Sequence, residues 1–198
     1  MRKIHFVIFY FFIILSTSLK AYSSDPKDFV FELVNDAINT LSDKNLSSEE
    51  KSKLIENIAI ENVDINALGL YTLGELRKSS EKSDISKYQI AFEKYFLKSI
   101  TSRLTDYSKS KFEIVNSDKK SSNYTIVSSK VVPKDGKPEI NIDWRIYTKN
   151  PDKPLIRDLI VEGLSLARTQ KEEFASILSS NNNDINVLIL KLEEFSNN

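Results

Sequence analysis

Residues 161–174, VEGLSLARTQKEEF, contain the residue types of a serine nucleophile at the end of a strand-like pattern. Ser165 follows Gly163, and helical spacing begins directly after it. A hydrolase serine of this kind needs a Gly-x-Ser-x-Gly turn and a base, which is usually histidine. Here no glycine follows the serine at that spacing, and Lys171 would lie on a different face of the same helix. We therefore predict that Gly163 lets the strand turn sharply and that Ser165 caps the next helix.

Two carboxylates of the last strand-like segment, Asp158 and Glu162, lie four residues apart on one face. At roughly 3.3 Å per residue their separation is about 13 Å, whereas the two carboxylates of a glycosidase are about 5–9.5 Å apart. The spacing therefore favours solvated or ion-paired carboxylates at a strand edge over a catalytic pair. We expect Asp143 and Arg145 to form a similar surface ion pair.

The segment GLYTLGEL, residues 69–76, has the glycine spacing of a phosphate-binding loop. Such a loop continues with lysine and then serine or threonine, which contact the phosphates and the magnesium ion. Here Glu75 and Leu76 occupy those positions, and a carboxylate would repel phosphate. We expect a point of close helix packing instead, where a glycine admits a neighbouring helix.

Imidazole and thiol chemistry depends on His5, because the chain has one histidine and no cysteine. His5 lies in an apolar run, residues 4–15, that follows two basic residues and precedes small residues. This order predicts a secretory signal peptide, residues 1–23, with cleavage after Ala21 or Ser23. A membrane span would need roughly 20 apolar residues, so cleavage is favoured over an N-terminal anchor.

The mature chain, residues 24–198, is then predicted to contain neither imidazole nor thiol. Such a chain cannot use Ser-His-Asp or Cys-His catalysis, and it cannot build a zinc site from histidine and cysteine. The full chain has 28 basic and 28 acidic residues, and loss of the leader leaves a small net negative charge. This balance gives no support to nucleic-acid binding. We expect no catalytic residue, no metal and no cofactor.

Hydrophobic periodicity changes from helical to alternating and back along the mature chain. Helices are predicted from Asp25-Pro26 to about 44, from 47 to 59, from 64 to 78 with interruptions at two glycines, from 84 to about 107, from 166 to 179 and from 184 to 195. Strands are predicted over 111–116, 122–132, 139–149 and 154–162. Short turn-like connections between the strands predict an antiparallel meander. The predicted class is α+β: N-terminal helices, one curved four-stranded antiparallel sheet, and two C-terminal helices, packed across a single face.

Large aromatic side chains recur on the helix predicted from 84 to about 107. Phe92, Tyr95 and Phe96 share one face of it, and the alternating strand 139–149 contributes Trp144. Such a stripe is typical of a packed core, but helices over a curved sheet are also a common way to enclose an apolar ligand. The residues alone leave both interpretations open.

The corner at residues 158–174 and the helices before it also carry a family signature. Its residues are Asp64, Leu73-Gly74, Phe92, Phe96, Tyr107, Asp158, Glu162-Gly163, Ser165-Leu166 and Phe174. In their order and spacing, over nearly all of residues 25–195, the chain resembles the MlaC / toluene-tolerance family of periplasmic lipid carriers. Two positions differ: Leu155 stands where the family usually has tryptophan, and Gln170-Lys171 stands where it usually has Tyr-Arg.

The resemblance implies a carrier that holds phospholipid acyl chains in an apolar cavity, with an outline similar to the NTF2 fold. It also implies a periplasmic protein, monomeric, that moves lipid between an outer-membrane lipid complex and an inner-membrane ABC transporter with an MCE-domain ring, and so maintains lipid asymmetry. Some members are associated with hopanoid metabolism, so a hopanoid-type lipid is an alternative cargo.

Lipid tails are expected between one face of the sheet and the helices that face it. The residues assigned to them are Leu70, Leu73, Phe92, Phe96, Ile100, Ile142, Trp144, Ile146, Leu159, Val161 and Leu166. Two rival classes remain: a ligand-free periplasmic interaction or chaperone module of the same shape with a filled core, and a hydrolase that uses carboxylates alone.

Overall fold

The computed structural model describes residues 21–104, 110–133 and 138–197. The elements are α1 (Pro26–Ser42), α2 (Ser48–Asn62), α3 (Ile65–Thr72), α4 (Leu76–Ser79), α5 (Lys82–Leu104), β1 (Lys111–Ser121), β2 (Tyr124–Val132), β3 (Ile140–Tyr147), β4 (Leu155–Val161), β5 (Leu164–Ser165), α6 (Leu166–Ser179) and α7 (Ile185–Asn197). The α+β class and the predicted order of elements are confirmed. The sheet has five strands instead of four, because the two residues of β5 pair with the end of β4.

The first two helices begin where their capping residues predict. Asp25 accepts hydrogen bonds from two backbone N–H groups in the first turn of α1, and a proline follows it. Ser47 and Glu50 form a reciprocal capping box at the start of α2. The long helix α5 begins at Lys82, and its expected end near Tyr107 lies outside the described residues.

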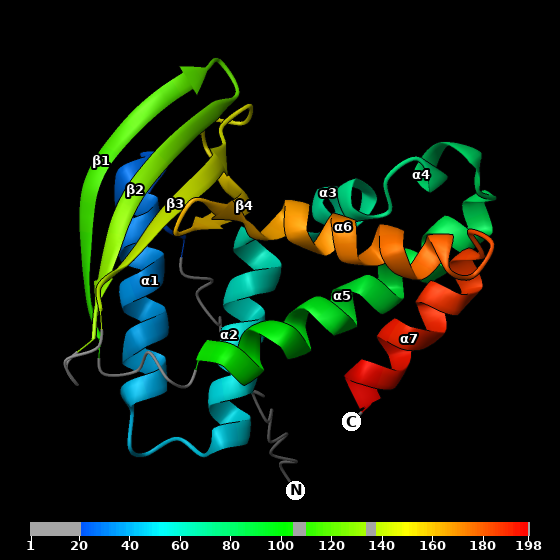
Figure 1. Ribbon diagram of the computed structural model, residues 1–198. Coiled ribbons are helices and arrows are strands. Elements are labelled where there is room, and N and C mark those ends of the chain that lie inside the picture. The colour runs from blue at the N-terminus through cyan, green and yellow to red at the C-terminus, as the bar shows by residue number, and fades with distance from the viewer. Residues whose placement is uncertain (1–20, 105–109, 134–137, 198) are drawn as a thin grey trace, which may run out of the picture.

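The sheet is an antiparallel meander in the order β1-β2-β3-β4-β5, of which the first four strands are labelled in Figure 1. In its register, Trp144 of β3 lies between Val127 of β2 and Leu159 of β4. The alternation predicted for β3 is confirmed, because Trp144 and Ile146 are buried while Arg145 between them is exposed. The two faces of the sheet therefore differ in chemistry.

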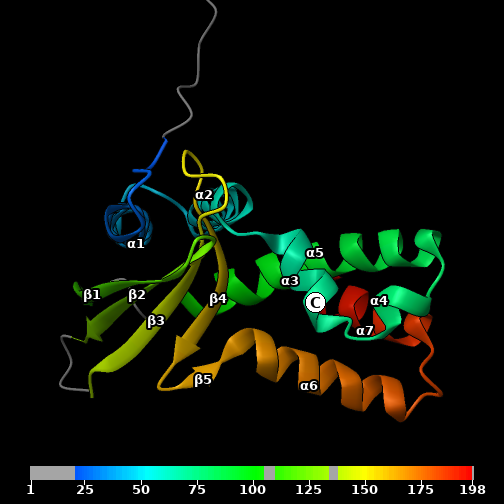
Figure 2. The same ribbon diagram turned by 90° about the horizontal axis from the view of Figure 1, so that it is seen from above.

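Helices α1 and α2 lie over the apolar face of the sheet (Figure 2). We call the resulting core the sheet cluster; its buried members are Phe29, Val30, Leu33, Phe112, Val127, Val131, Trp144, Ile146 and Ile156. One polar bond is enclosed with it, since the indole N–H of Trp144 donates to Ser129 Oγ at 2.8 Å. A buried tryptophan usually needs such a partner for its N–H group. The hydrogen bond to Ser129 therefore helps to fix the orientation of the Trp144 side chain in the core.

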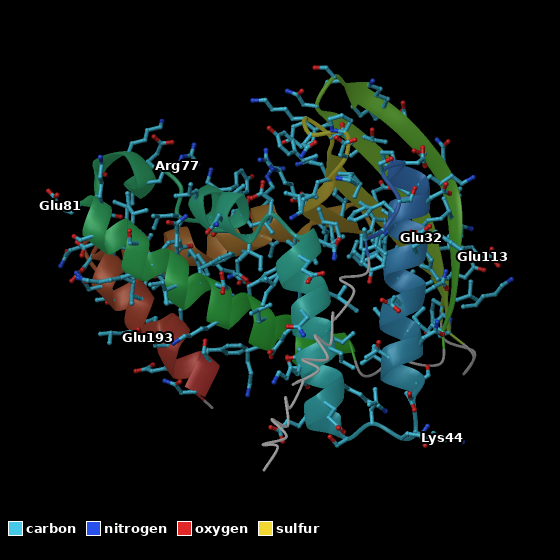
Figure 3. The ribbon with its side chains drawn as sticks, turned by 180° about the vertical axis from the view of Figure 1, so that it is seen from behind. Glu32, Lys44, Arg77, Glu81, Glu113 and Glu193 are labelled. Carbon is cyan, nitrogen blue, oxygen red and sulfur yellow. The ribbon has the colours of Figure 1, made fainter. Side chains whose placement is uncertain are left out.

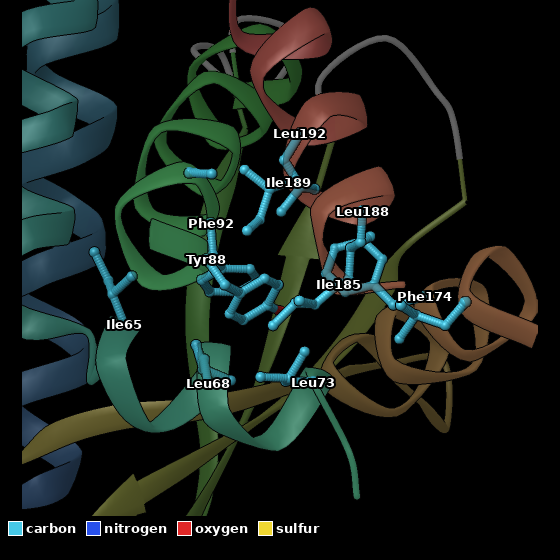
Figure 4. Packing of buried hydrophobic residues seen from close by; sticks show 12 residues of the cluster. Ile65, Leu68, Leu73, Tyr88, Phe92, Phe174, Ile185, Leu188, Ile189 and Leu192 are labelled. Atoms are coloured by element: carbon cyan, nitrogen blue, oxygen red, sulfur yellow. The ribbon is translucent and has the colours of Figure 1, made fainter. Parts of the chain in front are cut away.

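Helices α3, α5, α6 and α7 form a second apolar core (Figure 4). We call it the helical cluster; its buried members are Ile65, Leu68, Leu73, Tyr88, Ala91, Phe92, Phe174, Leu178, Ile185, Leu188, Ile189 and Leu192. The Phe92 ring lies 5.9 Å from Tyr88 and 6.3 Å, edge-on, from Phe174, measured between centroids. The hydroxyl oxygens of Tyr88 and Thr72 lie 2.9 Å apart, and burial raises the pKa of Tyr88. The phenol therefore stays protonated inside the core.

The segment with phosphate-loop spacing is helical, and the predicted packing point is confirmed. Helix α3 runs through Gly69, where an added Cβ would lie 2.9 Å from Cδ1 of Phe92. Gly74 has a φ of 64° and separates α3 from α4. Gly69 therefore allows α3 to approach α5, and Gly74 provides the left-handed turn that follows.

A side chain at position 69 should break this contact. Replacing Gly69 by valine should lower the free energy of unfolding by about 2 kcal/mol, since overpacking a filled core forces neighbours to move. Asn66→Val, at an exposed position of the same helix, is the matched control for the helix propensity of valine. Urea denaturation of both variants measures the difference, and equal losses of stability would contradict the assigned contact.

Charged side chains of both signs lie on the outside of the molecule. Those labelled in Figure 3 are Glu32, Lys44, Arg77, Glu81, Glu113 and Glu193, and they come from both the sheet side and the helical side of the molecule. Among the described residues, no helix combines the length and apolar character needed to cross a bilayer.

Candidate functional site

The corner between sheet and α6 is a small hairpin followed by a helix cap. Glu162 and Gly163 have φ angles of 48° and 81°, and Val161 pairs with Leu164 across them. Two successive residues with positive φ are characteristic of a type I′ two-residue turn. The chain therefore reverses once more before α6 begins, whereas the sequence predicted a direct turn from strand to helix.

Ser165 caps α6, as predicted. Its Oγ accepts the backbone N–H of Arg168 at 3.1 Å and donates to Oδ2 of Asp158 at 2.6 Å. The Ser165 hydroxyl is thus engaged on both sides by helix and strand, which is the bonding of a structural cap.

Asp158 was expected to be a solvated or ion-paired carboxylate at a strand edge, and it is ion-paired, but the start of α6 covers it, so it is not solvated. Asp158 is 3% exposed, and its Oδ1 accepts the backbone N–H of Ala167 at 3.0 Å. The expected partnership of Arg145 with Asp143 is replaced by an ion pair with Asp158, which lies directly opposite on β4, 3.5 Å away. Glu162, the other carboxylate considered, is exposed and accepts a hydrogen bond from the Asn141 side chain at 3.2 Å.

Loss of the buried carboxylate should weaken the corner. Asp158→Ala should lower the free energy of unfolding by about 2 kcal/mol, because the Ser165 hydroxyl and the Ala167 N–H lose their acceptor inside the protein. Asp143→Ala, on the neighbouring strand, is the control and should change stability much less. Thermal and urea unfolding test this; an equally stable Asp158→Ala protein would show that the corner does not depend on the carboxylate.

Sequence reasoning missed a second polar cluster around Arg157. Arg157 donates through Nε to Oδ2 of Asp64 at 2.8 Å and through Nη1 to the Tyr124 hydroxyl at 2.8 Å. Its guanidinium lies 3.4 Å from the ring centroid of Tyr147. Burial of Arg157 opposes its charge, but the hydrogen bonds to Tyr124 and Asp64 outweigh burial and raise its pKa. No short-range signal marks this cluster, because its members come from four separate segments.

Asp64 connects this cluster to α3. Its Oδ1 accepts the backbone N–H of Ala67 at 3.2 Å, so it caps the helix, and its own N–H donates to the carbonyl of Ile156 on β4 at 2.9 Å. The neighbouring residue Val63 forms a parallel bridge with Ile156. The helical part of the molecule is therefore joined to the sheet at this point by backbone and side chain together.

The residues assigned to lipid tails are divided between the two cores. Leu73 and Phe92 belong to the helical cluster, whereas Trp144 and Ile146 belong to the sheet cluster. The half-buried members are Leu70, Phe96, Ile100, Ile142, Leu159 and Val161, and Leu166 is 44% exposed. The apolar face of the sheet packs on α1, whereas the expected partners were the helices that carry Leu70, Leu73, Phe92, Phe96 and Leu166. The binding role of all these residues stays a prediction.

Val63 packs against both cores and lies at their border. Partly buried apolar side chains surround each core: Phe96 and Leu97 pack against the helical cluster, and Ile142 and Leu159 against the sheet cluster. Helix α5, which carries the first pair, runs from the helical part to the side of α2 (Figure 1). Both the sheet part and the helical part of the molecule thus have apolar side chains beside their cores that are only partly buried.

Within the described parts of the chain, no three His, Cys, Asp or Glu side chains are close enough together to hold a metal ion. The polar groups gathered by the fold are instead the two aspartate–arginine clusters, at Asp64 with Arg157 and at Asp158 with Arg145.

A family model for the MlaC protein matches residues 32–194. The chain belongs to the MlaC family. Its fold is similar to that of a phospholipid-binding protein from Ralstonia solanacearum, solved in complex with a phospholipid at 1.53 Å. The TM-score is 0.72 at 18% sequence identity, and the match covers 90% of this chain and 98% of that chain. No curated protein sequence matches the chain.

The resemblance to MlaC drawn from the signature residues is thereby confirmed, and the structure assigns those residues structural tasks. Asp64 caps α3, Ser165 caps α6, and Asp158 holds the corner together. Phe92 fills the helical cluster. In this MlaC-family chain the polar signature residues Asp64, Asp158 and Ser165 mark the junctions between sheet and helices, and Phe174 belongs with Phe92 to the helical cluster. Tyr107 lies outside the described residues.

Proposed function

We propose that the protein is a periplasmic lipid carrier that binds phospholipid acyl chains and shuttles lipid between an outer-membrane lipid complex and the MCE-domain ring of an inner-membrane ABC transporter. The observation that carries this proposal is the match to the MlaC family over residues 32–194. The similar fold of the Ralstonia solanacearum phospholipid-binding protein supports it.

The acyl chains would lie between the sheet cluster and the helical cluster. Phe96 and Ile100 of α5 and Ile142 of β3 are half-buried, so their remaining apolar surface is still available for a ligand. Each acyl CH₂ group moved out of water contributes about 0.8 kcal/mol, and a sixteen-carbon chain therefore contributes about 12 kcal/mol. Tails that enter this border would have to be enclosed almost completely.

The same magnitude supports delivery by docking. A lipid held with this free energy would leave into water very slowly, so transfer requires a protein partner that receives the tails directly. The carrier needs no reaction chemistry for this task. Ser165, the candidate nucleophile, and Asp158, one of the two candidate carboxylates, are hydrogen-bonded to each other and to backbone N–H groups.

A charge placed on the α5 side of the border should remove the cargo. Phe96→Asp should reduce co-purifying lipid at least several-fold, because a carboxylate cannot be enclosed with acyl chains without a partner. Ile90→Asp is the matched control, since Ile90 lies on the same helix and is 62% exposed. Native mass spectrometry of detergent-free protein, with organic extraction alongside, measures the lipid content.

The outcomes separate the candidate functions. A phospholipid mass that Phe96→Asp removes and Ile90→Asp retains supports the carrier and its tail site, whereas a hopanoid mass supports the alternative cargo. A folded Phe96→Asp protein with a full lipid load would show that the tails lie elsewhere. A wild-type protein with a cooperative thermal transition and no bound lipid would favour a ligand-free interaction module.

We also infer that the signal peptide ends at Ala21 and that a single domain follows. The Tyr22 hydroxyl donates to Oδ2 of Asp36 at 2.6 Å, and its ring lies edge-on to Phe29 at 6.3 Å. Cleavage after Ser23 would remove these contacts with α1. The intact mass of protein from the periplasm should therefore correspond to a chain that begins at Tyr22; a chain that begins at Ser24 would refute this inference.

A further inference from the structure

A hollow of about 450 Å³ lies where α3, the start of α6 and the strands β2 to β4 meet. It is lined by Ala67, Leu68, Tyr71, Tyr124, Arg145, Arg157 and Ala167. Two guanidinium groups and two phenol rings thus line one concave surface, and no acidic residue is among its described lining. Arg145 alternates along β3 with members of the sheet cluster, so the hollow is on the opposite face of the sheet.

Arg157 is held in place before any ligand arrives. Its bonds to Asp64 and Tyr124 and its contact with the Tyr147 ring orient the guanidinium plane. The Tyr124 hydroxyl uses an oxygen lone pair to accept from Arg157, which leaves its own proton for another acceptor. A prepositioned cation beside a hydroxyl donor suits an anion with several oxygen atoms.

Arg145 supplies a second cation that its own partner holds loosely. Its side chain is 46% exposed, and its distance to Oδ2 of Asp158 is 3.5 Å, whereas a charge-assisted hydrogen bond is about 2.7–2.9 Å long. The Asp158 oxygens already accept short bonds from Ser165 and Ala167. Arg145 also lines the neighbouring hollow of about 550 Å³ on the same sheet face, so it borders both concave surfaces.

Two helix starts add to the positive potential at this place. Ala67 lies in the first turn of α3, and Ala167 lies in the first turn of α6. Helix N-termini carry a partial positive charge that favours anions. Asp64 and Asp158, the carboxylates at these helix starts, each form an ion pair with one of the two arginines, so each pair has no net charge. The partial positive charges of the helix N-termini therefore leave a positive potential at this place.

We propose that this hollow binds a phosphate group between Arg145 and Arg157, with the organic part of the ligand against Tyr71 and Ala67. The phosphate belongs either to the headgroup of a lipid in a membrane surface or to a free phosphate ester. Arg145 is on the face of the sheet opposite to Trp144 and Ile146, so the proposed phosphate contact does not use the sheet face assigned to the acyl chains.

The test measures binding of two probes to the purified protein: sn-glycerol 3-phosphate by calorimetry, and phosphatidylglycerol vesicles by co-sedimentation. Arg145→Ala should weaken binding of the productive probe at least tenfold. Arg168→Ala removes an exposed arginine from the same corner, one that lies outside the hollow, and it should leave binding unchanged. Arg145→Lys, which keeps the charge without the fork of donors, should bind with intermediate affinity.

Binding of the soluble ester that depends on Arg145 assigns the site to free phosphate esters, and Arg145-dependent binding of vesicles alone assigns it to membrane headgroups. Either result supports the proposal. Equal affinity of the wild-type protein and folded Arg145→Ala, or no binding of either probe to the wild-type protein, overturns it. Co-purified lipid should be unchanged in Arg145→Ala, so a failure of the carrier proposal would show in lipid content while phosphate binding persists.

Discussion

The junction of α3 with β4 determines how the two apolar cores sit relative to each other. The Asp64 backbone bonds to the carbonyl of Ile156, its carboxylate caps α3, and the same carboxylate pairs with Arg157 at 2.7 Å. Val63, beside it, packs against both cores. Residues 63–64 thus form a backbone bridge to β4, the N-cap of α3 and an ion pair with Arg157. A shift of the helical part would therefore break all three interactions.

The corner before α6 repeats this arrangement, in which an aspartate binds both a helix start and an arginine. Asp158 accepts from Ser165 and from the first turn of α6, and Arg145 lies opposite on the neighbouring strand. Each aspartate is therefore shared between a helix start and an arginine of the sheet. The helical part is thus attached to the sheet at two points, at Asp64 and at Asp158.

Much of the local structure follows from short-range rules. The capping box at Ser47 and the cap at Ser165 form because a hydroxyl three residues from a free N–H group satisfies it. The period of two in β3 places Trp144 and Ile146 on one face whatever packs against it. The fifth strand was not predicted, since the positive φ of a non-glycine residue, Glu162, has no strong sequence signal.

The amino-acid sequence by itself determined the α+β class, the order of the main elements, the capped starts of α1, α2, α3 and α6, the apolar strand face and the family. Only the tertiary structure decided that the apolar residues divide into two cores, that Asp158 is buried, and that Arg157 meets Asp64, 93 residues away. Periodicity shows which side of an element is apolar, but burial and ion pairing depend on which distant element covers that side. Those contacts depend on how the whole chain packs. Many apolar faces must be buried at once, and the lowest-energy arrangement of all of them decides which residues become neighbours in space.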